Sequence, residues 1–123
     1  IEQAIHGNRM GDLSHAVQAH CEKEGYGVVR DLVGHGIGKA MHEDPSVPNF
    51  GKKGKGERLR SGMALAVEPM ITMGSYKTKT LNDGWTVITA DGSLAAHYEH
   101  DIIVREGKAE ILSTFDYIAE LSN

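Results

Sequence analysis

The chain has 123 residues, with 13 Lys and Arg against 17 Asp and Glu and a formal net charge of -4 at pH 7. This length suits one domain with a modest core and argues against two independent domains. The acidic balance argues against general nucleic-acid binding. One cysteine, Cys21, cannot form an intramolecular disulfide, which favours the reducing cytoplasm. No run approaches the ~18 apolar residues of a membrane span and no signal peptide opens the chain, so we expect a cytoplasmic protein without a membrane partner.

The first predicted element is one long helix. Asp12 is a candidate N-cap and Gly25 a candidate stop. The residues between them repeat at the i, i+3, i+4, i+7, i+8 spacing of an amphipathic helix: Leu13, Ala16, Val17, His20 and Cys21. Residues 26–30 follow as a short β-prone run.

A glycine-dense segment comes next, Gly34-His35-Gly36-Ile37-Gly38. Glycines at this density predict either a turn or a place where backbones come close together, and such a place can display a chemical group. Residues 44–60 contain Pro45, Pro48 and several glycines, which predicts an irregular loop rather than a domain linker.

The rest of the chain is predicted to be strand. The predicted strands span residues 63–72, 76–81, 86–89, 94–104 and 109–114. Hairpin-type sequences separate the later ones: Asn82-Asp83-Gly84, Asp91-Gly92 and Glu106-Gly107. Such short connections imply mainly antiparallel pairing, so one long helix on a curved antiparallel sheet is expected, which is an α+β fold.

The candidate chemistry begins with His35, because the glycines on either side leave its ring nitrogens open to a metal or a substrate. The alternative is a structural or merely exposed histidine, since flanking glycines also suit a turn. His35 alone does not decide between these interpretations.

Glu68 lies inside the apolar run 63–71. A carboxylate seldom lies in such a run unless it is paired or bound to a metal. The alternative is a Glu on the solvent face of a half-buried strand, which Ala64 and Ala66 on the same face argue against. Pro69 then limits this strand to an edge or a bulge, where sites tend to be built.

Glu99 belongs to a segment in which period-two geometry places His97, Glu99 and Asp101 on one face of a strand. Ionisable groups at this density are costly without partners. A polar edge strand is the alternative to a site. Taken together, one histidine and two glutamates on separate elements match the nitrogen and oxygen ligands of a hydrolytic divalent metal site.

His42 lies seven residues after His35, a spacing that fits no single-helix metal motif. It could donate a hydrogen bond to a reacting carbonyl, and a surface histidine that caps a loop is the alternative. The basic residues of segment 52–60 have no interleaved aromatic residues. They predict a solvated loop rather than an RNA contact.

Five motifs, in their order along the chain, resemble those of bacterial type I methionine aminopeptidases. They are Gly34-His35-Gly36-Ile37-Gly38, Met41-His42-Glu43-Asp44-Pro45, Val67-Glu68-Pro69-Met70, Asp83-Gly84-Trp85-Thr86-Val87 and Tyr98-Glu99-His100. The resemblance runs nearly end to end, and five ordered motifs are far more specific than any one of them. The related prolidases, creatinases and aminopeptidases P share the His, Glu, Glu pattern, but the second and fourth motifs are more similar to the methionine enzymes.

The resemblance implies a pita-bread (creatinase/aminopeptidase) fold and a hydrolase that removes the N-terminal methionine from nascent polypeptides whose second residue is small. It implies two divalent metal ions, of Co, Mn, Fe or Zn, with His35 and Glu68 as terminal ligands and Glu99 as a bridge. Glu68 and His42 would be catalytic, Glu68 by moving a proton from the attacking water and His42 by hydrogen bonding to the substrate carbonyl. Met41 and Trp85 would line the methionine pocket. Met41 stands where the family has an aromatic residue.

The resemblance also implies a first half of the fold, with two aspartate ligands and another histidine. No segment before His35 resembles it, and neither Asp12 nor Asp31 lies in the family's aspartate motif. We therefore expect residues 1–123 to be a single partial catalytic domain, the C-terminal half, inactive or weakly active alone. The alternatives are a non-catalytic pita-bread binding module and another pita-bread peptidase, such as aminopeptidase P or prolidase. A homodimer of the fragment, through the face where the first half would dock, is a further hypothesis.

Overall fold

The computed structural model describes residues 1–116 and 118. Within them the chain forms one long helix, α1 (Met10–Lys23), and ten short strands. The strands are β1 (Gly27–Val28), β2 (Gly34–Gly36), β3 (Glu43–Val47), β4 (Ala64–Val67), β5 (Met70–Thr72), β6 (Thr78–Thr80), β7 (Val87–Thr89), β8 (Ala95–His97), β9 (His100–Ile103) and β10 (Glu110–Ile111). All pairings between these strands are antiparallel, so the predicted α+β class is confirmed.

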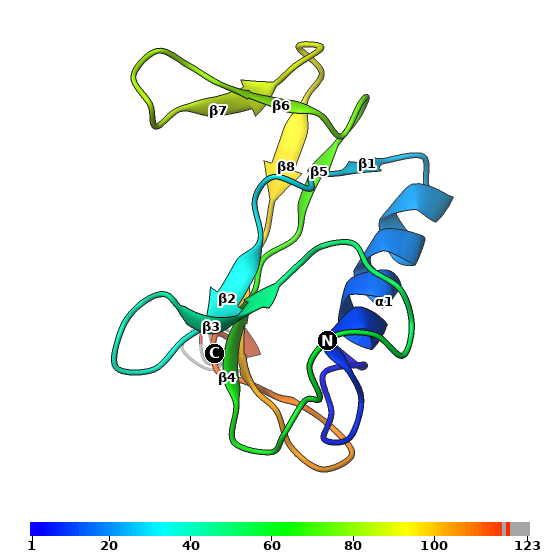
Figure 1. The fold of residues 1–123 in the computed structure, drawn as a ribbon, viewed down its shortest axis with the longest axis vertical. Helices are drawn as coiled ribbons and strands as arrows, with labels where there is room; N and C mark the ends of the chain where they lie inside the picture. Colours follow the sequence, from blue (N-terminus) through cyan, green and yellow to red (C-terminus); the bar gives the residue numbers. More distant parts are fainter. Residues whose placement is uncertain (117, 119–123) are drawn as a thin grey trace.

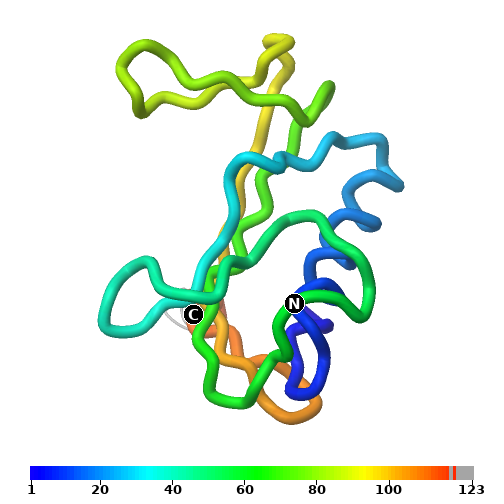
Figure 2. The backbone as a smooth tube through the Cα atoms, in the orientation of Figure 1, coloured from blue at the N-terminus to red at the C-terminus, as the bar shows by residue number. Residues whose placement is uncertain are grey.

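The antiparallel pairing is divided among three sheets (Figure 1). The largest has the strand order β10-β9-β4-β2-β3, and a second has the order β1-β5-β8. Strands β6 and β7 form a two-stranded hairpin, which projects away from the rest of the chain in Figure 2. Three connections join the two larger sheets: from β1 to β2, from β4 to β5 and from β8 to β9. The last two are the shortest, at two residues each.

Helix α1 begins before the predicted N-cap. Arg9 is the N-cap residue, and the Asp12 carboxylate accepts hydrogen bonds from the backbone N–H groups of Arg9 and Gly54, both at 2.8 Å. These two bonds lower the pKa of Asp12. The prediction of Asp12 as the N-cap is therefore wrong, although its carboxylate still accepts a backbone hydrogen bond at the start of the helix. Gly25 ends the helix as predicted, with a φ of 84°.

The apolar face predicted for α1 is only partly covered. Leu13 is buried, whereas the later members of that face border an open pocket together with Ile1 and Pro69. The helix therefore packs mainly through its first turns. Among the residues described, no helix has the length and apolar character needed to cross a membrane.

The core lies between the beginning of α1 and one face of the five-stranded sheet. Leu65 on β4 pairs with Ile102 on β9, and both side chains are completely buried. The whole cluster consists of Ala4, Met10, Leu13, Val47, Leu59, Leu65, Val67, Ile102, Val104 and Ala109. This packing fixes β4 and β9, the two strands that lead into the connections described above.

The glycine-dense segment is a strand and not a turn. Residues Gly34–Gly36 form β2, which lies inside the five-stranded sheet between β3 and β4. A Cβ atom on Gly34 would lie 2.2 Å from the carbonyl oxygen of Ala66, and one on Gly36 would lie 2.2 Å from that of Asp44. For residues 34–36, close backbone approach is confirmed and the turn is wrong, whereas Gly38 lies in the bend between β2 and β3.

Other boundaries also differ from the sequence prediction. The beginning of the predicted loop 44–60 belongs to strand β3. Asp91-Gly92 does not close a hairpin, because β7 pairs with β6 while β8 pairs with β5. The predicted hairpins at residues 82–84 and 106–107 are confirmed by the β6–β7 and β9–β10 pairs.

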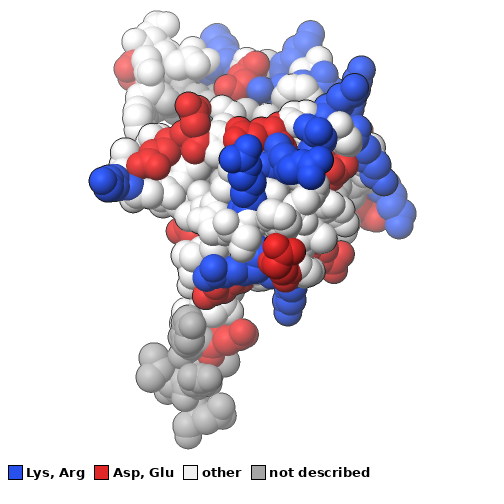
Figure 3. Space-filling view, turned by 60° about the horizontal axis from the view of Figure 1, so that its bottom comes forward, with Lys and Arg blue, Asp and Glu red and all other residues white. Residues whose placement is uncertain are grey.

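Charged side chains of both signs lie beside one another on the face that Figure 3 brings forward. The basic side chains of segment 52–60 are all exposed, as expected of a solvated loop: Lys52, Lys53, Lys55, Arg58 and Arg60. The backbone of this loop nevertheless packs on the start of α1, where the Gly11 N–H donates to the Lys55 carbonyl at 2.9 Å.

Candidate metal centre

Glu68 and Glu99 lie where the two larger sheets meet. Strand β4 ends at Val67 and β5 begins at Met70, and likewise β8 ends at His97 and β9 begins at His100. The two gaps are adjacent, because the Tyr98 N–H donates a hydrogen bond to the Pro69 carbonyl at 3.2 Å. Both glutamates therefore leave the backbone at irregular positions, where a side chain is free to turn away from the period-two alternation of a strand.

Pro69 explains one of these gaps. Proline cannot donate to a ladder, so the strand predicted over residues 63–72 divides on either side of it. The irregularity predicted at Pro69 is thus present. The edge position is not, because β4 lies between β9 and β2.

His35 reaches the same place from β2. It pairs with Ala66 on β4, and its side chain is only 16% exposed. Its Nδ1 lies 2.9 Å from the Gly36 carbonyl oxygen. Because a carbonyl oxygen only accepts hydrogen bonds, Nδ1 carries a proton, and Nε2 of a neutral ring then presents its lone pair.

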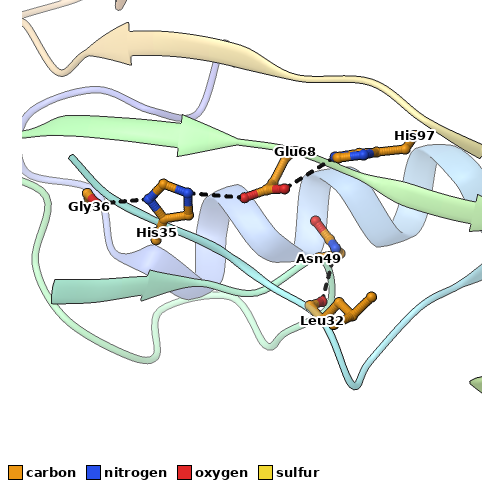
Figure 4. A network of polar contacts seen from close by, with 6 residues as sticks. All are labelled: Leu32, His35, Gly36, Asn49, Glu68 and His97. Carbon is orange, nitrogen blue, oxygen red and sulfur yellow. Dashed lines mark hydrogen bonds and ion pairs between the residues drawn. The ribbon is translucent and has the colours of Figure 1, made fainter. Parts of the chain in front are cut away.

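The lone pair of His35 faces a carboxylate. Nε2 lies 3.4 Å from Glu68 Oε1, and the Glu68 side chain is 14% exposed. Figure 4 shows the imidazole and the carboxylate pointing toward one another. Two lone pairs at this separation repel unless a proton or a cation lies between them. This is the usual arrangement of a histidine ligand, whose second nitrogen is held by a backbone carbonyl.

Three possible ligand atoms gather at this point. One atom each from His35, Glu68 and Glu99 lies within 4.8 Å of the other two. Donors around a first-row divalent ion, each about 2 Å from it, lie about 3–4 Å apart, so small side-chain rotations suffice. One imidazole and two carboxylates suit Mn, Fe, Co or Zn. The residues present therefore fit a divalent cation.

His97 is a polar neighbour that the sequence did not connect to Glu68. Its Nε2 lies 3.1 Å from Glu68 Oε2, on the side of the carboxylate away from His35 (Figure 4). The sequence predicts His97, Glu99 and Asp101 on one face of a single strand, which is wrong because the strand divides between His97 and His100. The sequence carries no signal for the contact with Glu68, because that contact depends on the pairing of β5 with β8.

His42 lies beside the cluster. Its ring centroid is 4.2 Å from that of His35, and the two rings are tilted by 54°. The side chain is exposed in the connection between β2 and β3. An open depression is lined by both histidines together with Val33, Gly34, Glu43, Asp44 and Ser46. A substrate group that approached His35 from this depression would therefore also meet His42.

Met41 and Trp85 stay apart from these side chains. They are 71% and 88% exposed, and the hairpin that carries Trp85 is well separated from the β2–β3 connection along the long axis of Figure 1. The Asp83 carboxylate shapes the Trp85 turn by accepting the N–H groups of Trp85 and Thr86. That Met41 and Trp85 line a methionine pocket therefore stays a prediction.

Asp101 lies on the same row of the sheet as His35, since His35 pairs with Ala66 and Ala66 with Asp101. Its Oδ1 is buried and has no hydrogen-bond partner among the described residues. A third carboxylate on this face adds to the negative potential around the cluster, which favours a cation there.

Comparison with known proteins indicates a metallopeptidase. The model of metallopeptidase family M24 matches residues 1–106. The chain belongs to this family. Family membership makes a divalent metal the expected cofactor, and the cluster of His35, Glu68 and Glu99 is where the structure offers donors for one.

Curated relatives of the chain include methionine aminopeptidases. The chain is 56% identical over 113 residues to the methionine aminopeptidase of Clostridium acetobutylicum, covering 92% of this chain and 45% of that protein. It is 48% identical to methionine aminopeptidase 1 of Bacillus subtilis, covering 92% of this chain and 46% of that protein. The chain thus spans about half the length of the curated relatives that it matches.

Solved structures show the same similarity. The crystal structure of the Thermotoga maritima methionine aminopeptidase superposes with a TM-score of 0.90 at 48% identity, covering 93% of this chain and 46% of that one. The Rickettsia prowazekii enzyme superposes with a TM-score of 0.87 at 44% identity, covering 92% and 46%. The predicted resemblance to methionine aminopeptidases and to their fold is therefore confirmed.

Proposed function

We propose that the chain is part of a methionyl aminopeptidase, a metal-dependent hydrolase that removes the N-terminal methionine from nascent polypeptides whose second residue is small. The observation that carries this proposal is the cluster of His35, Glu68 and Glu99, whose ligand atoms lie within 4.8 Å of one another in a member of family M24. Relatives named methionine aminopeptidases, at 48–56% identity, support the choice of substrate.

In this proposal His35, Glu68 and Glu99 would hold the divalent ions. When bound, the ions would activate a water molecule and polarise the scissile carbonyl. Glu68 accepts a proton from the attacking water, because its carboxylate lies inside the cluster. His42 donates a hydrogen bond to the substrate carbonyl oxygen, from its place 4.2 Å from the His35 ring. Met41 and Trp85 contact the methionine side chain.

We further propose that residues 1–123 are a partial catalytic domain, the C-terminal half of the pita-bread fold. The chain spans 45% of the Clostridium acetobutylicum relative, which supports this division. The two remaining ligands, both aspartates, would come from the other half, together with another histidine of the site. Alone, the chain would bind metal weakly and hydrolyse peptides very slowly. The cytoplasm is the proposed compartment, because nascent chains are the proposed substrate.

Metal binding tests the site itself. Titration of the protein with Co(II), followed by visible absorption, is expected to give a weak complex of one ion per chain. The variant His35→Ala is expected to lose most of this binding, since it removes the only nitrogen donor of the cluster. His20→Ala, which changes an exposed helix residue, is the matched control. Equal binding by His35→Ala and the control would contradict the proposed site.

Peptide hydrolysis tests the activity. With added Co(II) or Mn(II), the protein alone is expected to release negligible methionine from a Met-Ala-Ser tripeptide. Robust turnover would contradict the partial-domain proposal. Mixing it with the N-terminal half of the Clostridium acetobutylicum relative is expected to restore cleavage of Met-Ala-Ser but not of an Ala-Pro-Ala peptide. Preference for the proline peptide would instead indicate an aminopeptidase P or prolidase type of activity.

We propose that the chain by itself forms a homodimer. Large apolar side chains are exposed on and beside the β1-β5-β8 sheet, among them Met73 at 65% and Leu94 at 73%. A second copy would cover part of this surface.

A further inference from the structure

We propose that His97 is a positioning residue that fixes the Glu68 carboxylate in the orientation in which it binds metal. This inference rests on the proposed function, because it assigns a role toward the ion that the cluster would hold. His97 is not one of the three residues whose ligand atoms gather within 4.8 Å. It contacts the cluster through Glu68 alone among the polar contacts drawn in Figure 4.

The geometry of the contact assigns the roles of its two partners. His97 Nε2 lies 3.1 Å from Glu68 Oε2, which is hydrogen-bond distance. An ionised carboxylate only accepts, so the Nε2–H of His97 donates. A neutral ring with its proton on Nε2 is sufficient. The other carboxylate oxygen, Oε1, then stays directed at His35 Nε2, 3.4 Å away.

Glu68 needs such a partner because its backbone gives little support. It lies in the gap between β4 and β5, outside both sheets, and a glutamate side chain has three rotatable bonds. His97 is the last residue of β8, and it pairs across the sheet with Met70, two residues after Glu68. The β1-β5-β8 sheet thus holds one oxygen of Glu68, while His35 on the five-stranded sheet faces the other.

The consequence is a cluster that depends on both sheets. His35 and Glu68 are 16% and 14% exposed, so water competes little for the carboxylate oxygen that faces His35. The His97 side chain is 49% exposed and contacts the other carboxylate oxygen, Oε2. Without that donor the Glu68 carboxylate would rotate toward solvent. Each binding event would then cost the conformational entropy of fixing this side chain again.

The test is the affinity for Co(II), measured by absorption titration of the protein and its variants. His97→Ala is expected to bind Co(II) ~10–100-fold more weakly, the usual effect of removing a group that orients a ligand. His97→Gln places an amide N–H near the position of Nε2, so its loss is expected to stay under ~10-fold. His20→Ala is the control. Equal affinity of wild type and His97→Ala, or equal weakening in His97→Ala and His97→Gln, overturns the proposal.

Nitrogen NMR of ¹⁵N-histidine-labelled wild-type protein gives a second readout that needs no substitution at His97. The proposal predicts that His97 carries its proton on Nε2 and keeps it when Zn(II) is added, while His35 Nε2 shifts as a ligand. A large metal-dependent shift of His97 nitrogen would make it a direct ligand and overturn the positioning role. If the wild type binds metal and substitution of His97 does not change the affinity, only this inference is overturned. Absence of any metal binding by wild type contradicts the proposed function as well.

Discussion

At the scale of single residues, the site depends on glycines that bring three strands close together. Gly34 and Gly36 flank His35 on β2, and neither has a positive φ. Their lack of a side chain matters for space, because a Cβ on Gly36 would collide with the Asp44 carbonyl at 2.2 Å. The backbone of β2 can therefore lie close to those of β3 and β4, which places His35 inside the five-stranded sheet.

The variant Gly36→Ala tests this packing. Because the nearest atoms belong to the backbone of Asp44, β3 must shift, and the free energy of unfolding is expected to fall by about 1–3 kcal/mol. Gly38→Ala is the matched control, since its new Cβ would meet only the flexible Glu43 carboxylate. Urea denaturation of both variants provides the measurement. A loss for Gly38→Ala as large as that for Gly36→Ala would show that the clash with backbone is not the cause.

A second residue, Asp91, ties two turns together through its carboxylate. It accepts the backbone N–H groups of Ser75 at 2.7 Å and Ser93 at 3.0 Å. These bonds lower the pKa of Asp91 to about 2. A depressed carboxyl pKa stabilises the folded state above the unfolded value of 3.8, and this contribution is lost as the pH falls from 3.8 to about 2.

We expect a carbon NMR titration of the carboxyl groups to show Asp91 with a pKa near 2. In Asp91→Asn the unfolding free energy is expected to lie below that of wild type at neutral pH, and the difference should shrink as the pH falls through the window from 3.8 to 2. An Asp91 that titrates at 3.8, or a difference that does not change with pH, would show that the two backbone hydrogen bonds do not stabilise the ionised carboxylate.

At the scale of elements, β4 and β9 form the pair from which both glutamates of the cluster depart. Ile102 on β9 is completely buried against Leu65, so Ile102→Ala removes core contacts and is expected to cost about 2–5 kcal/mol of unfolding free energy. Ile88 on β7 is 43% exposed and serves as the control, with a much smaller expected loss for Ile88→Ala. Thermal unfolding measured by circular dichroism compares the two. A similar loss in both variants would show that the β4–β9 pair does not hold the core.

Much of this arrangement could be predicted from the sequence, and the parts that could not depend on contacts between distant segments. The helix and its end at Gly25 follow from local periodicity and capping chemistry. The three ligand candidates follow from residue types that are costly in their surroundings. The assignment of β2 to the sheet interior does not follow, because glycine has no strand preference and the close backbone of Ala66 on β4, far along the chain, cannot be foreseen. The contact between His97 and Glu68 could not be predicted either, because it depends on the pairing of β5 with β8.

At the scale of the whole molecule, the described residues leave a partly uncovered apolar surface. Strand β8 is an edge of the β1-β5-β8 sheet, and all three of its residues are exposed. Met73 and Leu94 lie side by side at one end of this sheet, where the Met73 N–H donates to the Leu94 carbonyl at 2.8 Å. Beside them an open pocket of ≈ 250 Å³ lies between the sheet and the β6–β7 hairpin, lined by residues that include Val29, Met70 and Ile88. Exposed edges and apolar patches of this kind favour association with another chain.

The chain is therefore expected to self-associate at micromolar concentrations through this edge, and sedimentation equilibrium measures the dissociation constant of the dimer. Leu94→Lys places a charge on the apolar patch, and it is expected to raise that constant by at least ~10-fold, because burying an unpaired ammonium group is costly. Leu112→Lys is the matched control, since Leu112 is 46% exposed and follows β10 at the far edge of the other sheet. A monodisperse monomer at every concentration would contradict self-association, and equal weakening by both variants would place the interface elsewhere. If the first half of the fold covers the same edge, adding the N-terminal half of a relative should dissociate the dimer, whereas an unchanged dimer would show that the two surfaces are different.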